Sequence, residues 1–256
     1  MLDYDAEAAL YDGTRGGEPR AKAAAAAVLG LLPAGARALL DVGCGTGIVT
    51  ARLAAAGAGL RVRGADAAHG MLRKAADRLG RDSVVLADAA RLPFGAASFD
   101  AVSAVWLLHL VDPATARRVV GEAARVLRPG GVLVTTVDKD AAHDVGSDID
   151  RVLAPWRDDR GATDRADLVA AYAAAGGLEP YGEAYFTGHG QGRTPRGAAE
   201  TLVGGKFASW FLAGRAAGEQ VARELRALPE PDLRRADPVY RVLALRKEGG
   251  TGRQGA

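Results

Sequence analysis

Three glycines at alternate positions, Gly43, Gly45 and Gly47, are the part of the sequence best suited to hold a ligand. They follow the apolar run ALLDV at residues 38–42 and precede a helical pattern. A glycine loop between a strand and a helix presents backbone N–H groups to a ligand, because no Cβ blocks a close approach. The alternative is a tight turn that binds nothing, and three glycines are a costly way to make one.

The spacing of these glycines does not fit the dinucleotide fingerprint, which is G-x-G-x-x-G. Counted from Gly43, the sixth position is Ile48, and counted from Gly45 it is Thr50. The pattern is instead D-x-G-x-G-x-G, with Asp41 inside the preceding apolar run. A dinucleotide is therefore not the expected ligand.

The pattern resembles the class I S-adenosylmethionine-dependent methyltransferases. Further motifs of that family follow in the expected order: GADAAHGML (64–72), DAARLPF (88–94), SFDAV (98–102) and VLRPGG (126–131). Together they are similar to the broad branch that includes the ubiquinone and menaquinone C-methyltransferases and many small-molecule methyltransferases. The resemblance covers roughly residues 38–137.

The resemblance implies S-adenosyl-L-methionine as cofactor and S-adenosyl-L-homocysteine as product. In the family, Asp41 helps to hold the cofactor's amino group, directly or through water. Asp66 accepts hydrogen bonds from the ribose hydroxyls, Asp88 receives the adenine amino group, and Ala89 offers a backbone N–H to the ring. Met71 lies against the adenine, although its helical placement would suit a core residue equally well. The full implied cofactor-binding set is Asp41, Gly43, Cys44, Gly45, Gly47, Asp66, Ala67, Met71, Asp88, Ala89 and Val105.

Histidines are the candidates for a general base, which a hydroxyl or an acidic carbon would need in order to lose its proton. His109 is the first candidate, because it follows the predicted fourth strand at the cofactor edge of the sheet. The alternative is a histidine that only packs near the start of the next helix. His143 and His189 are further candidates with weaker placement, and His69 is expected on the surface.

The acceptor site is predicted from Tyr11, Arg15, Trp106 and His189. Tyr11 and Arg15 lie in a polar stretch, residues 11–20, which is expected to be a loop and could form a lid. Trp106 follows the fourth strand, where an aromatic wall would face an acceptor. Four other aromatic residues could line the same pocket or could equally belong to the core: Trp156, Tyr185, Phe186 and Trp210. Arg193 and Arg196 could hold an anionic substrate, or could simply be solvated.

The composition narrows the class of protein. The 256 residues carry 33 basic and 31 acidic side chains, spread along the chain, so no nucleic-acid surface is indicated. The single cysteine, Cys44, excludes an internal disulfide and a multi-cysteine metal site, and no metal is predicted. The start of the chain lacks the pattern of a secretory signal, and no apolar run is long enough to cross a membrane. A cytoplasmic protein is expected.

The order of the predicted elements indicates an α/β fold. Short apolar runs alternate with helical segments, as in a doubly wound, mostly parallel sheet. Strands are predicted at residues 38–42, 60–66, 83–88, 99–105, 132–137 and 237–247. Helices are predicted at 21–32, 48–57, 70–79, 113–127, 163–175, 195–204 and 213–228, and a long loop at 138–150. The resemblance implies seven strands in a Rossmann-like methyltransferase fold, with an inserted or appended substrate-shaping region.

The chain is expected to be a single methyltransferase domain over residues 1–256. Its parts are an N-terminal helical lid region (1–37), the cofactor-binding core (38–137), a substrate-shaping segment with the last strands (138–247) and a flexible tail (248–256).

The leading hypothesis is direct in-line transfer of a methyl group to a small-molecule metabolite of specialised or quinone metabolism. The alternatives are an RNA or peptide methyltransferase and a protein that binds the cofactor without catalysis. Base-amino methyltransferases of this fold usually have Asn/Asp-Pro-Pro-aromatic after the fourth strand, but residues 103–106 read SAVW. Neither a nucleic-acid partner nor a membrane partner is expected.

Asp66→Ala should weaken cofactor binding by about ten- to a hundredfold, because charge-assisted hydrogen bonds to the ribose would be lost. Titration calorimetry with S-adenosyl-L-homocysteine measures this. If Asp66 were only a helix cap, the affinity would hardly change.

Overall fold

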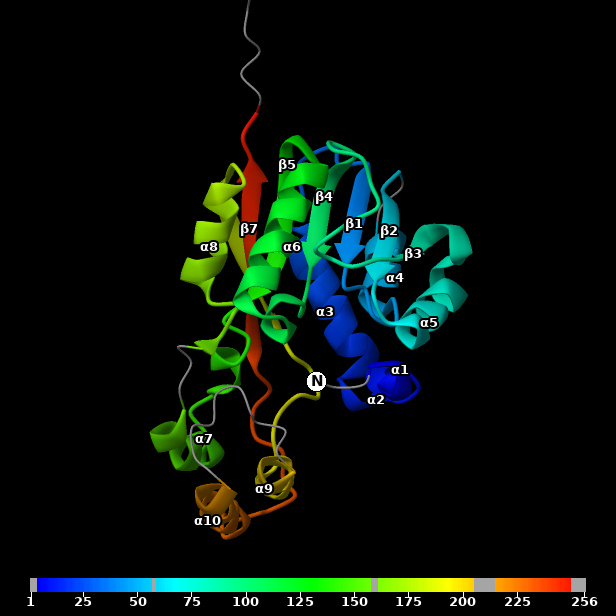
Figure 1. The fold of residues 1–256 in the computed structure, drawn as a ribbon. Coiled ribbons are helices and arrows are strands. Elements are labelled where there is room, and N and C mark those ends of the chain that lie inside the picture. Colours follow the sequence, from blue (N-terminus) through cyan, green and yellow to red (C-terminus); the bar gives the residue numbers. More distant parts are fainter. Residues whose placement is uncertain (1–3, 57–58, 158–160, 205–214, 250–256) are drawn as a thin grey trace, which may run out of the picture.

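A seven-stranded sheet forms the centre of the molecule, and helices cover both of its faces (Figure 1). The computed structural model describes residues 4–56, 59–157, 161–204 and 215–249. The strands are β1 (Ala38–Val42), β2 (Arg61–Asp66), β3 (Val84–Leu86), β4 (Phe99–Ala104), β5 (Leu127–Val137), β6 (Leu178–Thr187) and β7 (Val239–Lys247). Their order is β3-β2-β1-β4-β5-β7-β6, and β7 runs antiparallel to both of its neighbours. The predicted α/β, doubly wound and mostly parallel class is confirmed.

Ten α-helices lie in the part of the chain that the structure describes. They are α1 (Tyr4–Glu7), α2 (Tyr11–Thr14), α3 (Gly17–Leu29), α4 (Ile48–Ala55), α5 (His69–Leu79), α6 (Pro113–Val126), α7 (Asp148–Leu153), α8 (Ala166–Ala175), α9 (Pro195–Val203) and α10 (Arg215–Arg226). The helix predicted at 113–127 begins at Pro113, where the Asp112 carboxylate caps it by accepting a hydrogen bond from the Thr115 N–H at 2.9 Å.

The strand order reverses between β1 and β4, which lie side by side and parallel. Their outgoing connections lead to opposite sides of the sheet, and a crevice therefore opens at their carboxyl ends. The glycine turn follows β1, and Trp106 follows β4 at the same edge. This reversal is what brings the two predicted halves of the site together.

Two apolar cores hold the helices to the sheet. One packs α6 and α8 against one face and includes Leu40, Val102 and Leu133. The other packs α3 and α4 against the opposite face and includes Leu39 and Val134. Neighbouring residues of one strand point to opposite faces, so β1 is buried along its whole length. A strand covered on both sides reads as a continuous apolar run, which explains why the sequence pattern located it.

The stretch at residues 11–20 is not the loop predicted from its polar, glycine-bearing sequence. Helix α2 occupies its first part, and α3 begins at Gly17, four residues earlier than expected. Gly16 and Gly17 have φ of 82° and 51°, so the chain turns between the two helices through left-handed glycines. Arg20 therefore lies on a helix, where it is buried.

Strand β6 is the element that pattern analysis did not locate. It lies at the edge of the sheet and pairs only with β7 among the described strands. Most of its residues are exposed or half-buried, and its register shifts between Pro180 and Gly182. An exposed edge strand carries little apolar periodicity, and proline and glycine weaken the remaining signal.

Helices α7, α9 and α10 form a separate layer beyond the carboxyl edge of the sheet (Figure 1). They share their own apolar core, which includes Ile149, Leu153, Leu202 and Leu225. The residues predicted as a long loop at 138–150 end inside this layer, because Ser147 caps α7 with a capping box. Within the described ranges, no helix is both long and apolar enough to cross a membrane.

Gly47→Ala should lower the free energy of unfolding by about 1–3 kcal/mol, because Gly47 has a left-handed backbone conformation. An added Cβ would also lie 2.9 Å from the Ala75 Cα. Gly121→Ala is the matched control: nothing lies within 4 Å of its Cβ position inside α6, so this change should stabilise by about 0.5–1 kcal/mol. Urea unfolding of both variants measures the difference. Equal effects of the two changes would show that the turn tolerates a side chain.

Candidate functional site

The glycine turn is an unusual stretch of backbone with three left-handed residues. Gly43, Gly45 and Gly47 have φ of 69°, 56° and 74°. A Cβ on Gly43 would lie 2.9 Å from Leu107 Cδ1, whereas nothing stands within 4 Å of the Cβ position of Gly45. Glycine is required at these positions by conformation, and at Gly47 also by space, because its Cβ would meet the Ala75 backbone at 2.9 Å. Gly43 and Gly45 are half-buried and Gly47 is buried, so the first two form the part of the turn that a ligand could approach.

Asp66 lies at the end of β2 and is joined directly to this turn. One carboxylate oxygen accepts a hydrogen bond from the Gly45 N–H at 2.8 Å, and the other accepts one from the Ala68 N–H at 2.8 Å. The side chain is half-buried, and the next residue, Ala67, is exposed. Each carboxylate oxygen has a further lone pair, so Asp66 can hold the turn and still accept from a ligand hydroxyl.

Asp41 is fully enclosed beneath the turn. Its carboxylate accepts hydrogen bonds from the Thr50 hydroxyl at 2.6 Å and from the Ser103 hydroxyl at 2.7 Å. Burial raises the pKa of Asp41 to about 6, against the lowering effect of these two bonds. The residue therefore ties β1 to α4 and β4, a structural contact that the sequence did not indicate.

The other residues predicted to hold the cofactor lie around the same edge. Ala87, just before Asp88, donates its N–H to the Asp66 carbonyl at 2.9 Å, which places the end of β3 beside β2. Asp88 is exposed, and its carboxylate accepts from the Ala90 N–H at 2.8 Å. Ala89 is half-buried, while Met71, Val105 and Cys44 are buried. Burial raises the pKa of the Cys44 thiol, so this cysteine is not a nucleophile at neutral pH.

Helices α1 and α2 contact the glycine turn and the start of α5. Asp12 accepts a hydrogen bond from the Thr46 hydroxyl at 2.5 Å and pairs with Arg78, which also donates to the Thr46 carbonyl at 2.6 Å. Asp5 accepts a hydrogen bond from the Gly70 N–H at the start of α5. Burial raises the pKa of Tyr4 to about 12. Sequence analysis missed these acidic contacts, because isolated aspartates in a polar stretch carry no distinctive spacing.

Trp106 has a strained backbone, and only one of its two N–H groups has a hydrogen-bond partner among the described residues. Its φ is 57°, a left-handed value that is rare for a bulky residue, and its N–H donates to the Thr136 hydroxyl at 2.7 Å. The indole ring packs edge-on against Phe186 and Tyr240, with centroids 5.5 and 5.6 Å away. The indole Nε1 is buried and has no hydrogen-bond partner among the described residues. Strain of this kind is often kept at functional sites.

His109 and His143 lie near each other at the carboxyl ends of β4 and β5. His109 has a buried Nδ1 with no partner in the described ranges, and burial and Lys139 lower its pKa to about 3. His143 has Nε2 3.2 Å from the Tyr240 hydroxyl, and burial and Arg193 lower its pKa to about 2. Both imidazoles are therefore neutral at physiological pH, and burial opposes their protonation.

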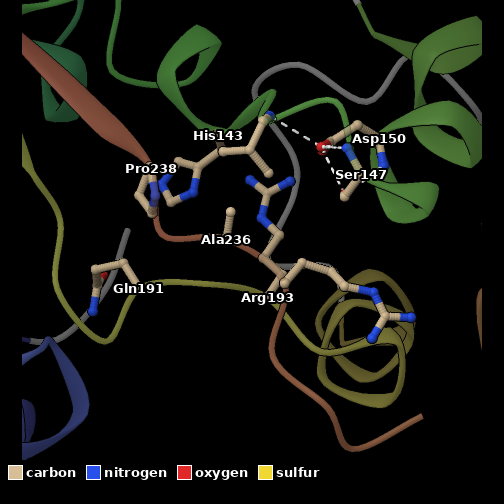
Figure 2. Close-up of a pocket in the computed structure, with 9 residues that line it drawn as sticks. His143, Ser147, Asp150, Gln191, Arg193, Ala236 and Pro238 are labelled. Carbon is tan, nitrogen blue, oxygen red and sulfur yellow. Dashed lines mark hydrogen bonds between the residues drawn. The ribbon is translucent and has the colours of Figure 1, made fainter. Parts of the chain in front are cut away.

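A small cavity beside His143 connects this region to the helical layer (Figure 2). The Arg193 side chain extends between His143 and Asp150 in that view. Asp150 is buried and accepts hydrogen bonds from Ser147 and from the Val145 N–H. These contacts cap the start of α7 and hold the residues that precede it.

Several predicted acceptor residues lie elsewhere or have other contacts. Tyr185 is 58% exposed and bonds to Glu183, so it does not line an apolar pocket. Phe186 is buried against Trp106, Trp156 belongs to the helical layer, and Trp210 lies outside the described residues. His189 is exposed, as is His69. Arg196 is exposed and pairs with Asp232. Arg15 lies 5.8 Å from the centre of the Tyr11 ring, on the lid side of the site.

The family model described as "Methyltransferase domain" matches residues 40–135. An uncharacterized methyltransferase of Mycobacterium tuberculosis is 44% identical over 103 residues, which cover 40% of each chain. The demethylmenaquinone methyltransferase of Clavibacter sepedonicus is 42% identical over 106 residues, which cover 40% of this chain and 41% of the relative. The chain thus spans about two fifths of the length of the curated relatives it matches.

The crystal structure of the cyclase SpnF is similar to the whole fold. Its TM-score is 0.61, with 23% identity over 96% of this chain and 94% of that one. At this identity the likeness concerns the fold. The similar solved structure and the strand order both indicate the Rossmann-like fold that the sequence predicts.

Asp41→Asn should remove a pH dependence of stability in the ligand-free protein. Because the pKa of folded Asp41 is about 6 and its ordinary value is 3.8, the folded chain binds the extra proton between these values. The wild type therefore loses stability as pH rises from 3.8 to about 6, and the variant lacks this loss. Urea unfolding of both proteins across this range should show a growing difference in favour of the variant. A constant difference would contradict the shift.

Proposed function

We propose that this chain, a member of the class I S-adenosylmethionine-dependent methyltransferases by its match over residues 40–135, transfers a methyl group to a small-molecule acceptor. The observation that carries the proposal is the joint between the glycine turn and Asp66. It combines partly exposed glycine backbone with a carboxylate that keeps free lone pairs, which suits a ligand with a ribose and a charged amino-acid part.

The residues at this edge fit S-adenosyl-L-methionine. Gly43 and Gly45 would approach its amino-acid part, Asp66 would accept from the ribose hydroxyls, and Asp88 with Ala89 would meet the adenine. When bound, the cofactor supplies a methyl group already activated on a sulfonium. The protein then needs to align the acceptor and exclude water, and it needs no covalent nucleophile of its own.

The N-terminal helices would exclude water. Asp12 and Arg78 hold α2 on the glycine turn through Thr46, so the cofactor side would be closed when α2 is in this position. Helix α2 also carries Tyr11, and Arg15 follows it with its guanidinium 5.8 Å from the centre of the Tyr11 ring. We propose that residues 1–37 act as the lid, that residues 138–247 shape the acceptor site, and that the whole chain works as one domain.

Two neutral imidazoles could take a proton from the acceptor. His109 has an unpartnered Nδ1 within the described ranges, and His143 contacts the Tyr240 hydroxyl. Their low pKa values make them weak bases, so they suit an acceptor whose proton becomes acidic as the new bond forms. We propose His109 as the base, because it follows β4 directly.

A small-molecule acceptor is supported by one of the relatives, which is a demethylmenaquinone methyltransferase. A cytoplasmic setting is supported by the lone cysteine in the sequence. A second candidate function, cofactor binding without methyl transfer, is favoured by one observation: the similar fold of SpnF belongs to a protein described as a cyclase.

Incubation with methyl-labelled cofactor and fractionated cell extract separates these functions. The proposal predicts label in a small organic molecule, and Asp66→Ala should reduce the transfer at limiting cofactor. Label in RNA or peptide would overturn the acceptor class. Tight cofactor binding with no transfer to any fraction would establish the second candidate instead.

A further inference from the structure

Arg20 is a buried cation next to the proposed acceptor site. Its residue is 7% exposed, and its guanidinium lies 4.0 Å from the centre of the Trp106 ring. The Tyr11 hydroxyl is a polar neighbour that favours its charged form. None of the salt bridges of the described residues joins it to a carboxylate, unlike the exposed Arg52, which pairs with Glu18. A buried arginine without an acidic partner is costly, so its position calls for an anion from outside the chain.

Trp106, the ring against which Arg20 lies, also has a polar group without a hydrogen-bond partner among the described residues. The Trp106 Nε1 is buried without a hydrogen-bond partner among the described residues, and its backbone is held in a left-handed conformation. Two donors, one guanidinium and one indole N–H, thus belong to one stacked pair. Oxygen atoms of a ligand would satisfy both, and no arrangement of apolar groups would do so.

The surroundings add positive charge. The largest electrostatic influences on the Tyr240 hydroxyl come from Arg20, Arg193 and Arg15, and Asp140 is the carboxylate among them. Phe186 and Tyr240 pack against Trp106 and form aromatic walls. A planar ligand with a negative group matches both the charge and the shape of this cluster.

We propose that Arg20 and Trp106 form an anion subsite that binds the carboxylate of a small, planar methyl acceptor. The proposal rests on the proposed function, since it names the class of acceptor for the same site. The guanidinium would pair with the carboxylate in a charge-assisted, forked contact, and the indole N–H would donate to the same group. The plane of the acceptor would lie against the aromatic walls.

The lid provides access to the subsite. The Tyr11 hydroxyl now neighbours the Arg20 guanidinium, on the side that we assign to an acceptor oxygen. Tyr11 is on α2, and Gly16 and Gly17 join α2 to α3 with left-handed φ. Rotation at these glycines would withdraw Tyr11 while Arg20 remains fixed on α3. Tyr11→Phe, which removes only the competing hydroxyl, should therefore leave carboxylate affinity unchanged or higher.

Fragment binding tests the subsite directly. Benzoate and 4-hydroxybenzoate would be compared with their primary amides by titration calorimetry and ligand-detected NMR, with the protein loaded with S-adenosyl-L-homocysteine. We expect at least one carboxylate to bind about tenfold or more tightly than its amide. Arg20→Met should abolish that preference, and Trp106→Phe, which keeps a ring but lacks the N–H, should reduce it. Arg117→Met, an exposed change on α6, should leave it intact.

Three outcomes would overturn the proposal: no fragment binds, acid and amide bind equally, or Arg20→Met keeps the preference. Thermal unfolding checks that Arg20→Met is folded, and Arg20→Lys provides a second variant that keeps the charge but loses the fork. Cofactor-product affinity is measured in the same series. A wild type that binds no S-adenosyl-L-homocysteine would refute the proposed function. If Arg20→Met loses affinity for S-adenosyl-L-homocysteine but still prefers the carboxylates to their amides, Arg20 would belong to the cofactor site instead.

Discussion

The hydrogen bond from the Gly45 N–H to the Asp66 carboxylate is the contact on which the site depends. It fixes the end of β2 against the turn that follows β1. The Ala65 carbonyl strengthens the joint, because it accepts hydrogen bonds from the N–H groups of Gly43 and Cys44 at 2.8 and 3.1 Å. Parallel pairing of β1 and β2 brings these groups to one edge, and left-handed glycines turn the backbone outward. A half-buried carboxylate and partly exposed glycine backbone thus share one rigid corner.

A second group of residues forms at the ends of β4 and β5, on the other side of the strand reversal. The strained Trp106 and the neutral His109 follow β4, while His143 follows β5 and meets Tyr240 from β7. The N-terminal helices connect the two groups, since α2 contacts the glycine turn and α3 carries Arg20 to Trp106. Closure over the cofactor and arrangement of the acceptor side are therefore linked through the same short segment.

The sequence predicted the parts of the fold in which local pattern and tertiary environment agree. Buried strands such as β1 and β4 appear as continuous apolar runs, and the Asp112-Pro113 pair starts α6 where expected. Edge strand β6 escaped prediction because its exposed face has no apolar alternation. Arg20 was placed in a loop because its flanking glycines suggested one, and its burial against Trp106 depends on a contact 86 positions away in the chain. The sequence motif indicated the cofactor edge, whereas the acceptor side is built from long-range contacts that no local spacing reveals.

Titration calorimetry on the purified, ligand-stripped chain tests the central claim most directly, with S-adenosyl-L-methionine, S-adenosyl-L-homocysteine and a nicotinamide dinucleotide as separate ligands. The account predicts one binding site per chain for each sulfur compound and no binding of the dinucleotide. Binding of the dinucleotide alone would contradict it, because the corner formed by Gly45 and Asp66 would then serve a different ligand.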